Sequence, residues 1–173
     1  ERESEIDGVR CIPSLKSLTS KVDLLVIAAP SASVPGLIND ANASGLVESG
    51  IIISGGLGET DGSADLGAEV AEAILRGRES GEGAVFLGPN CMGVQSRPGR
   101  YDTFFIPEDK IGPIPEGPES PVAIISQSGA FVISRASHLQ HLKPRFAVTL
   151  GNQTDVTVSD LVSVLSPRSD IQV

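Results

Sequence analysis

The sequence predicts an α/β fold, in which a doubly wound parallel sheet is followed by part of a second α/β domain. The first observation is a set of short, continuous apolar runs, such as residues 24–27, which have the length of strands buried on both faces. The second is helical spacing of apolar residues between these runs. The third is a glycine-rich or polar loop after most runs. Alternation of strand, loop and helix with short connections is typical of parallel sheets with right-handed crossovers.

The first half of the chain supplies the elements of the first domain. Residues 1–7 are charged and are expected to fray, residues 8–12 favour a short strand, and residues 13–18 favour a short helix with Pro13 early. Apolar runs then predict strands at residues 22–29, 51–54 and 84–87. Helices are predicted between them at residues 34–43 and 63–76, the first ending at Gly45 as a C-terminal cap.

A change of composition separates the two domains. Residues 97–121 hold six prolines with several glycines between them, which leaves little room for regular structure. We therefore predict a domain at residues 1–97, a proline-rich linker at residues 98–120, and part of a second domain at residues 121–173. In that second part, strands are expected at residues 122–125 and 145–150, with helices from residue 130 and at residues 156–165.

The turn after residue 125 is the strongest candidate for an anion site. Ser126, Ser128 and Gly129 stand between a buried strand and the start of a helix, whose first amides have no partner inside the helix. The helix dipole contributes only about 0.3–1 kcal/mol to binding of an anion, so added hydrogen bonds are needed to hold a phosphoryl group. The alternative is that Ser126 or Ser128 simply caps the helix.

Composition narrows the class of partner. The net charge of −9 disfavours nucleic acid and anionic membranes, and no apolar run reaches the ~20 residues that span a bilayer. Cys11 and Cys91 are far apart and lack the spacing of metal ligands, so we expect no metal site and two reduced thiols. With no signal peptide in the sequence, these thiols favour a cytoplasmic location.

Four motifs in a fixed order resemble one enzyme family. They are residues 88–93 (GPNCMG), a proline-rich linker, residues 125–130 (ISQSGA), and Gly151-Asn152 followed by Asp155 and Asp160. Together they resemble the nucleoside-diphosphate-forming acyl-CoA synthetases, which include ADP-forming acetyl-CoA synthetase, the succinyl-CoA ligase α subunit and ATP-citrate lyase. The resemblance implies a Rossmann-like CoA-binding domain followed by part of a flavodoxin-like ligase domain.

The resemblance also implies roles for particular residues. The residues implied to bind CoA are Ala29, Pro30, Ser31, Gly55, Gly56, Leu57, Gly58, Glu59, Asn90 and Cys91. The residues implied to hold phosphate are Ser126, Ser128, Gly129 and Ala130. The family interconverts acyl-CoA, phosphate and a nucleoside diphosphate with a free acid, CoA and a triphosphate. It does so through a phosphohistidine, which the resemblance places outside this chain, so no catalytic residue is assigned here. It further implies that ADP/ATP or GDP/GTP, with Mg, binds a part not present here, on a partner subunit or a fused ATP-grasp domain.

Several features depart from the family or stay open. The strand and glycine-containing loop with which the family begins have no match before Gly8, so the chain is expected to be a fragment that is inactive alone. We expect His138 and His141 to be ordinary helix-end residues and Cys91 to be a buried thiol, although each could be a nucleophile. Asp155 and Asp160 could approach a metal, but a loop and a helix start explain them more simply. The isomer of the Gly88–Pro89 bond is open.

Two other functions compete with the ligase. The same architecture can serve as a CoA-sensing regulatory module, for example fused to an acetyltransferase, without phosphoryl chemistry. A nicotinamide-dependent oxidoreductase is less favoured, because residues 55–58 lack the G-x-G-x-x-G spacing of a dinucleotide loop.

Overall fold

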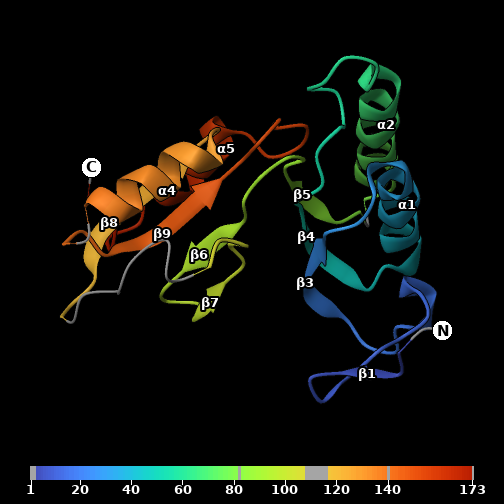
Figure 1. Ribbon diagram of the computed structural model, residues 1–173, viewed down its shortest axis with the longest axis horizontal. Helices are drawn as coiled ribbons and strands as arrows, with labels where there is room; N and C mark the ends of the chain where they lie inside the picture. Colours follow the sequence, from blue (N-terminus) through green and yellow to red (C-terminus); the bar gives the residue numbers. More distant parts are fainter. Residues whose placement is uncertain (1–2, 82, 108–116, 140, 173) are drawn as a thin grey trace.

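Two sheets organise the chain in the computed structural model, which describes residues 3–81, 83–107, 117–139 and 141–172 (Figure 1). The first sheet contains three parallel strands in the order β3 (Val22–Ile27), β4 (Val47–Ile52) and β5 (Val85–Leu87). The crossovers between them hold the helices α1 (Val34–Ser44) and α2 (Ala64–Ser80). The parallel arrangement confirms the predicted α/β class and places the carboxyl ends of all three strands at one edge.

Helices α1 and α2 pack against each other on a single face of this sheet (Figure 1). Ile38 of α1, Val70 of α2 and Ile52 of β4 lie in one buried cluster. Both helices end at a glycine in the left-handed region, Gly45 (φ 61°) and Gly81 (φ 75°), which is the backbone conformation that glycine adopts without strain.

The other face of the first sheet is covered differently from a doubly wound sheet. Ile51 and Leu87 form a second buried cluster with Val148 and Leu150, which come from the second half of the chain. In the described residues, apolar side chains of the second unit therefore cover this face of the first sheet, and α1 and α2 cover the other.

The second sheet has four strands in the order β7 (Tyr101–Asp102), β6 (Val94–Ser96), β9 (Pro144–Thr149) and β8 (Ser120–Ser126). Strands β8 and β9 are parallel, whereas β6 runs antiparallel to both β9 and β7. The helix α4 (Gly129–His138) packs against β8 and β9, and α5 (Val158–Leu165) packs against β8.

Strands β6 and β7 lie near the expected boundary between the two domains. Pairing with β9 brings residues 94–96 into the second sheet, although they precede the predicted boundary at residue 97. Residues 101–102 are paired too, within a linker expected to have little regular structure; its residues 108–116 lie outside the described residues.

The N-terminal segment is a small hairpin. Strands β1 (Glu5–Ile6) and β2 (Val9–Arg10) are antiparallel, joined by Asp7 (φ 50°) and Gly8 (φ 79°). Two positive φ values in a two-residue loop match the twist of a hairpin. The expected fraying of residues 1–7 is therefore wrong for Glu5–Ile6.

Two short 3₁₀ turns, η1 (Leu15–Ser17) and η2 (Ser31–Ser33), complete the elements. Among the helices of the described residues, none has the length and apolar character needed to cross a membrane.

Candidate functional site

The loops that follow β3, β4 and β5 meet at the carboxyl edge of the first sheet. Ser54 joins the first two, because its hydroxyl donates to the carbonyl of Ala29 (2.6 Å) and accepts from the amide of Ala29 (3.2 Å). It also joins the third, since its carbonyl accepts from the amide of Asn90 (3.0 Å). Ser31 lies beside Gly56: its Oγ is 3.7 Å from the position that a Cβ on Gly56 would take. Members of all three predicted CoA-binding segments are thus neighbours.

Glu59 closes the loop that contains residues 55–59. Its carboxylate accepts hydrogen bonds from the amide of Gly56 and from the amide of Leu57 (2.9 Å). The next amide, of Gly58, donates to the hydroxyl of Ser63 (3.0 Å). The three consecutive amides at the centre of the loop are therefore paired within the chain, so this loop offers a ligand its shape and its side chains rather than these N–H groups.

The surroundings of Glu59 keep it ionised. Burial alone would raise the pKa of this carboxyl, but hydrogen bonds from Asn152 and from the amides of Gly56 and Leu57 outweigh that effect and leave the pKa below its usual value. Asn152 donates to Glu59 Oε2 at 2.8 Å, although it follows β9 in the second sheet. The loop after β4 is thereby bound to the second unit.

Hydrogen bonds from the end of β9 hold the loop of residues 88–93 in place. Its Gly88–Pro89 peptide bond is cis, and Asn90 adopts a left-handed backbone (φ 57°). Thr149 at the end of β9 accepts from the amides of Met92 (2.8 Å) and Gly93 (3.0 Å) and donates to the carbonyl of Gly93. Asn90 is exposed at the strand-end edge.

Two residues assigned to CoA by resemblance are buried. Cys91 is 3% exposed, its thiol donates to the carbonyl of Ile52, and burial raises its pKa to about 11. The thiol is therefore neutral and inaccessible, as expected for a buried structural cysteine. Leu57 is also 3% exposed and belongs to the core. Neither side chain is exposed to a ligand in this structure.

The turn after β8 places a helix N-terminus beside the first unit. Ser128 caps α4, since its hydroxyl accepts from the amide of Phe131 (3.3 Å), and its own amide donates to the hydroxyl of Ser126 (3.0 Å). Gly129 and Ala130 supply the first two amides of the helix, which have no acceptor inside it. Met92 packs so closely on Gly129 that a Cβ there would lie 2.7 Å from its sulfur.

Strand-end loops of both sheets therefore adjoin one another. The amide of Asn152 donates to the carbonyl of Pro89 (2.8 Å), and the amide of Gly151 donates to the carbonyl of Gln127 (3.1 Å). These hydrogen bonds connect the loop after β9 to the turn after β8 on one side and to the loop after β5 on the other. A molecule lying along the carboxyl edge of the first sheet could reach the N-terminus of α4.

The structure contains a pocket of about 530 Å³ beside this edge. Its polar walls are Glu59, Asn152 and Thr154, and its apolar wall is a series of small residues on α2, namely Ala64, Gly67 and Ala71.

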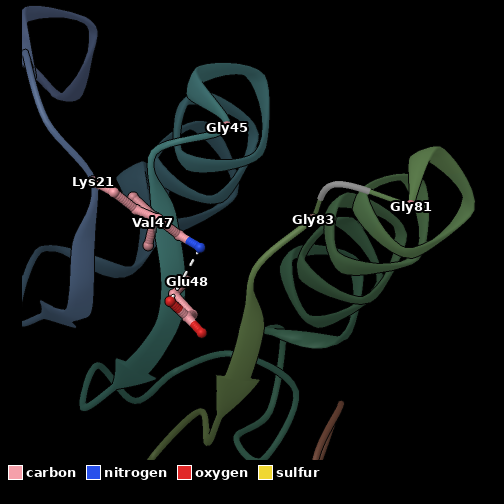
Figure 2. Close-up of a pocket in the computed structure, with 6 residues that line it drawn as sticks. All are labelled: Lys21, Gly45, Val47, Glu48, Gly81 and Gly83. Atoms are coloured by element: carbon pink, nitrogen blue, oxygen red, sulfur yellow. Dashed lines mark ion pairs between the residues drawn. The ribbon is translucent and has the colours of Figure 1, made fainter.

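A different pocket, of about 390 Å³, lies at the opposite, amino edge of the first sheet (Figure 2). There Lys21 and Glu48 point toward each other and form an ion pair of 3.1 Å, beside the glycines that end α1 and α2. Helix carboxyl ends disfavour anions, so this second pocket does not suit a phosphorylated ligand.

The remaining candidates have structural roles in the described part of the chain. His138 is exposed in the last turn of α4, with Nδ1 2.7 Å from the carbonyl oxygen of Ser134, and His141 is exposed beyond it. Asp155 binds Arg78 of α2 through both carboxylate oxygens, each 2.9 Å from Nη2. Asp160 closes a capping box with Thr157 at the start of α5.

Sequence reasoning missed the side chains that connect the loops. Ser54, Thr149 and Asn152 make the contacts described above, and none was assigned to the site. Each stands directly at or after a strand end, and Asn152 also belongs to one of the motifs that carry the resemblance.

Two family models match the chain. Residues 1–97 match the model described as CoA binding domain, and residues 119–173 match the model described as succinyl-CoA ligase like flavodoxin domain. These two matches follow one another in the order that the sequence motifs indicated.

The curated relatives that the chain resembles are ADP-forming acetate–CoA ligases. The chain is 29% identical over 171 residues to an ADP-forming acetate–CoA ligase of Methanocaldococcus jannaschii, covering 98% of this chain and 22% of that protein. It is 29% identical over 172 residues to the α subunit of ADP-forming acetate–CoA ligase II of Pyrococcus furiosus, covering 98% of this chain and 35% of that subunit. The chain thus spans about a fifth to a third of the length of these relatives. Neither relative is named as an acetyltransferase fusion, and the CoA-sensing alternative gains no support from them.

Solved structures resemble the fold. A dinucleotide forming acetyl-coenzyme A synthetase 1 of Ca. Korarchaeum cryptofilum, in complex with phosphate and ADP, has a TM-score of 0.81 at 28% identity, covering 98% of this chain and 34% of that one. An ATP citrate lyase of Methanothrix soehngenii, in complex with citrate and coenzyme A, has a TM-score of 0.60 at 14% identity, covering 87% of this chain and 24% of that one. The second likeness concerns the fold alone.

Proposed function

The chain belongs to the CoA binding domain family, and we propose on that basis that it is the CoA-binding portion of an acyl-CoA synthetase of the nucleoside-diphosphate-forming type. In this proposal the whole protein interconverts acyl-CoA, phosphate and a nucleoside diphosphate with a small carboxylic acid, CoA and a nucleoside triphosphate. The phosphoryl group passes from an acyl phosphate to a histidine outside this chain, and then to the nucleotide.

The observation that carries this proposal is the position of the α4 N-terminus. Its first two amides, of Gly129 and Ala130, have no acceptor inside the helix, and Gly129 packs on Met92 of the loop of residues 88–93 at the carboxyl edge of the first sheet. An oxyanion held there is stabilised by N–H groups and by the helix dipole, without any charged side chain. A thioester lying along the sheet edge toward α4 would meet phosphate at this turn.

The proposal also concerns where the nucleotide and the metal bind and which subunits the whole protein contains. We propose that ADP/ATP or GDP/GTP with Mg binds a separate ATP-grasp part, on a partner subunit or fused to this chain. The name of the Pyrococcus furiosus relative, an α subunit, supports a partner subunit. Cys11 and Cys91 are both free thiols, which supports a cytoplasmic location.

Calorimetric titration of the protein with CoA and with inorganic phosphate tests the proposal. We expect one CoA site per chain and a phosphate site that remains available when CoA is bound. Binding of CoA without any phosphate site would favour a CoA-sensing module instead, and no binding of CoA would refute the proposal.

A further inference from the structure

Asn152 belongs to the second unit, yet its side chain reaches into the loop of residues 55–59. Its amide nitrogen donates to Glu59 Oε2 at 2.8 Å and lies 3.4 Å from the carbonyl oxygen of Leu57. The same oxygen of Glu59 accepts from the amide of Leu57 at 2.9 Å. One carboxylate oxygen thus joins the backbone of the loop to a side chain from the other sheet.

The backbone of Asn152 is itself fixed. Its amide donates to the carbonyl of Pro89 (2.8 Å). Two residues later, the amide of Thr154 donates to the carbonyl of Gly88 (3.1 Å). Asn152 therefore keeps a constant position relative to the loop of residues 88–93. Its side chain adds a second link from that loop to the loop of residues 55–59, beside the hydrogen bond from the Asn90 amide to the Ser54 carbonyl.

Glu59 lies where the two loops meet. A Cβ on Gly55 would be 3.0 Å from Glu59 Oε1 and 3.2 Å from Asn90 Oδ1, so these two side chains crowd above the same glycine. Glu59 is exposed, and a solvent-exposed carboxylate on a glycine-rich loop needs a partner to keep one geometry. Within the described residues, Asn152 is the side chain that donates to it.

We propose that Asn152 is a positioning residue for CoA binding: by holding Glu59, it fixes the shape of the loop at residues 55–59 and aligns that loop with Asn90. This inference rests on the proposed function, in which both loops contact CoA. Asn152 does not touch the ligand in this account and acts only through Glu59. The ligase-like unit thereby contributes to the CoA affinity of the unit before it.

Hydrogen exchange and CoA calorimetry on the whole protein test this inference together. In Asn152→Ala, exchange at the amides of Gly56 and Leu57 should accelerate. The Kd for CoA should rise roughly three- to tenfold, the range expected for loss of one ordinary hydrogen bond, because Glu59 is exposed and keeps its two backbone donors. Glu59→Gln should weaken CoA binding as well. The double variant should bind CoA no more weakly than Glu59→Gln alone, because the two residues act in series.

Two further variants separate positioning from a general structural effect. Asn152→Asp keeps the volume of the side chain but replaces the donor by a second carboxylate facing Glu59, so it should weaken CoA binding at least as much as Asn152→Ala. Asn39→Ala removes an exposed asparagine of α1, whose only described side-chain contact is with Arg76 (3.3 Å), and should leave both readouts unchanged.

Unchanged exchange at residues 56–57 in Asn152→Ala would overturn the inference, as would additive losses of CoA affinity in the double variant. Full CoA affinity in Asn152→Asp would also overturn it, since volume alone would then suffice. If the unsubstituted protein binds no CoA while exchange still accelerates in Asn152→Ala, the proposed function fails and the positioning role of Asn152 for the loop stands.

Discussion

At the scale of single residues, the surroundings of Cys91 decide its chemistry. The thiol lies in the cluster between the two sheets and has a pKa raised to about 11, so the native protein keeps its proton at any pH near neutrality. The thiolate is the reactive form of cysteine, and neither access nor ionisation is available here. Cys91 thus has a packing role in the motif at residues 88–93 and does not act as a nucleophile.

Alkylation kinetics measure this directly. In the native protein at pH 8, iodoacetamide should modify the partly exposed Cys11 and spare Cys91, whereas urea should make both react. Because the folded pKa is raised, the stability that the buried thiol contributes is complete below its unfolded pKa and is lost as the pH rises toward 11. Equal native rates for the two cysteines would contradict the buried, neutral assignment.

At the scale of secondary-structure elements, the start of α4 has a geometry compatible with both capping and anion binding, the combination that the family resemblance led us to expect for Ser126 and Ser128. Ser128 caps the helix, and the neighbouring amides of Gly129 and Ala130 have no acceptor in the described part of the chain. Capping therefore does not compete with anion binding at this turn. It orients the turn so that the free amides point out of the helix end.

Ser128→Asp separates these roles. Aspartate is as good a cap as serine, so α4 should remain folded. Its charge repels a phosphate at the same amides, and we expect phosphate binding to fall at least tenfold while the Kd for CoA changes less than twofold. Ser134→Asp adds the same charge farther along α4 and serves as the control. Unchanged phosphate affinity in Ser128→Asp would refute the assignment of this turn.

At the scale of the whole molecule, a few side chains hold the two units together. Asp155 follows β9, accepts from the amide of Phe86 in β5 at 2.7 Å, and binds Arg78 of α2 through both oxygens. The Asp155 side chain is only 11% exposed. Removing its cation leaves a largely buried carboxylate with one neutral donor, which is costly.

Arg78→Ala should therefore lower the free energy of unfolding by about 1–3 kcal/mol. Arg76, two residues earlier in α2, provides a matched control, because its ion pair with Glu72 is exposed on both sides (55% and 70%). Its loss should cost about 0–0.5 kcal/mol. Urea unfolding of both variants checks the difference, and equal midpoints would show that the Arg78–Asp155 contact does not stabilise the assembly of the two units.

The parts of the fold that local patterns determine could be predicted from the sequence. Strands β3 and β9 each contain a continuous apolar run, at residues 24–27 and 146–148, and α1 ends at the glycine that its pattern indicated. Strand β6 has only three residues and becomes a strand through pairing with β9, about fifty positions away, so no local signal marks it.

The same limit applies to the candidate site. The strand-end loops were predictable, because parallel strands bring their carboxyl ends to one edge. The bond between Asn152 and Glu59 joins residues 93 positions apart, and nothing in either loop alone predicts it. The packing of the second unit against the first sheet could not be predicted either, because the apolar residues of a strand do not indicate which partner buries them.

A labelling experiment on the whole protein, with an acyl-CoA such as acetyl-CoA and labelled inorganic phosphate, distinguishes the ligase from its alternative. We expect acid-labile label on the protein that appears only with acyl-CoA and is discharged by a nucleoside diphosphate. We also expect that Ser128→Asp abolishes this label while CoA remains bound. A protein that binds CoA but acquires no label would contradict the ligase assignment and leave Ser126 and Ser128 as helix-capping residues alone.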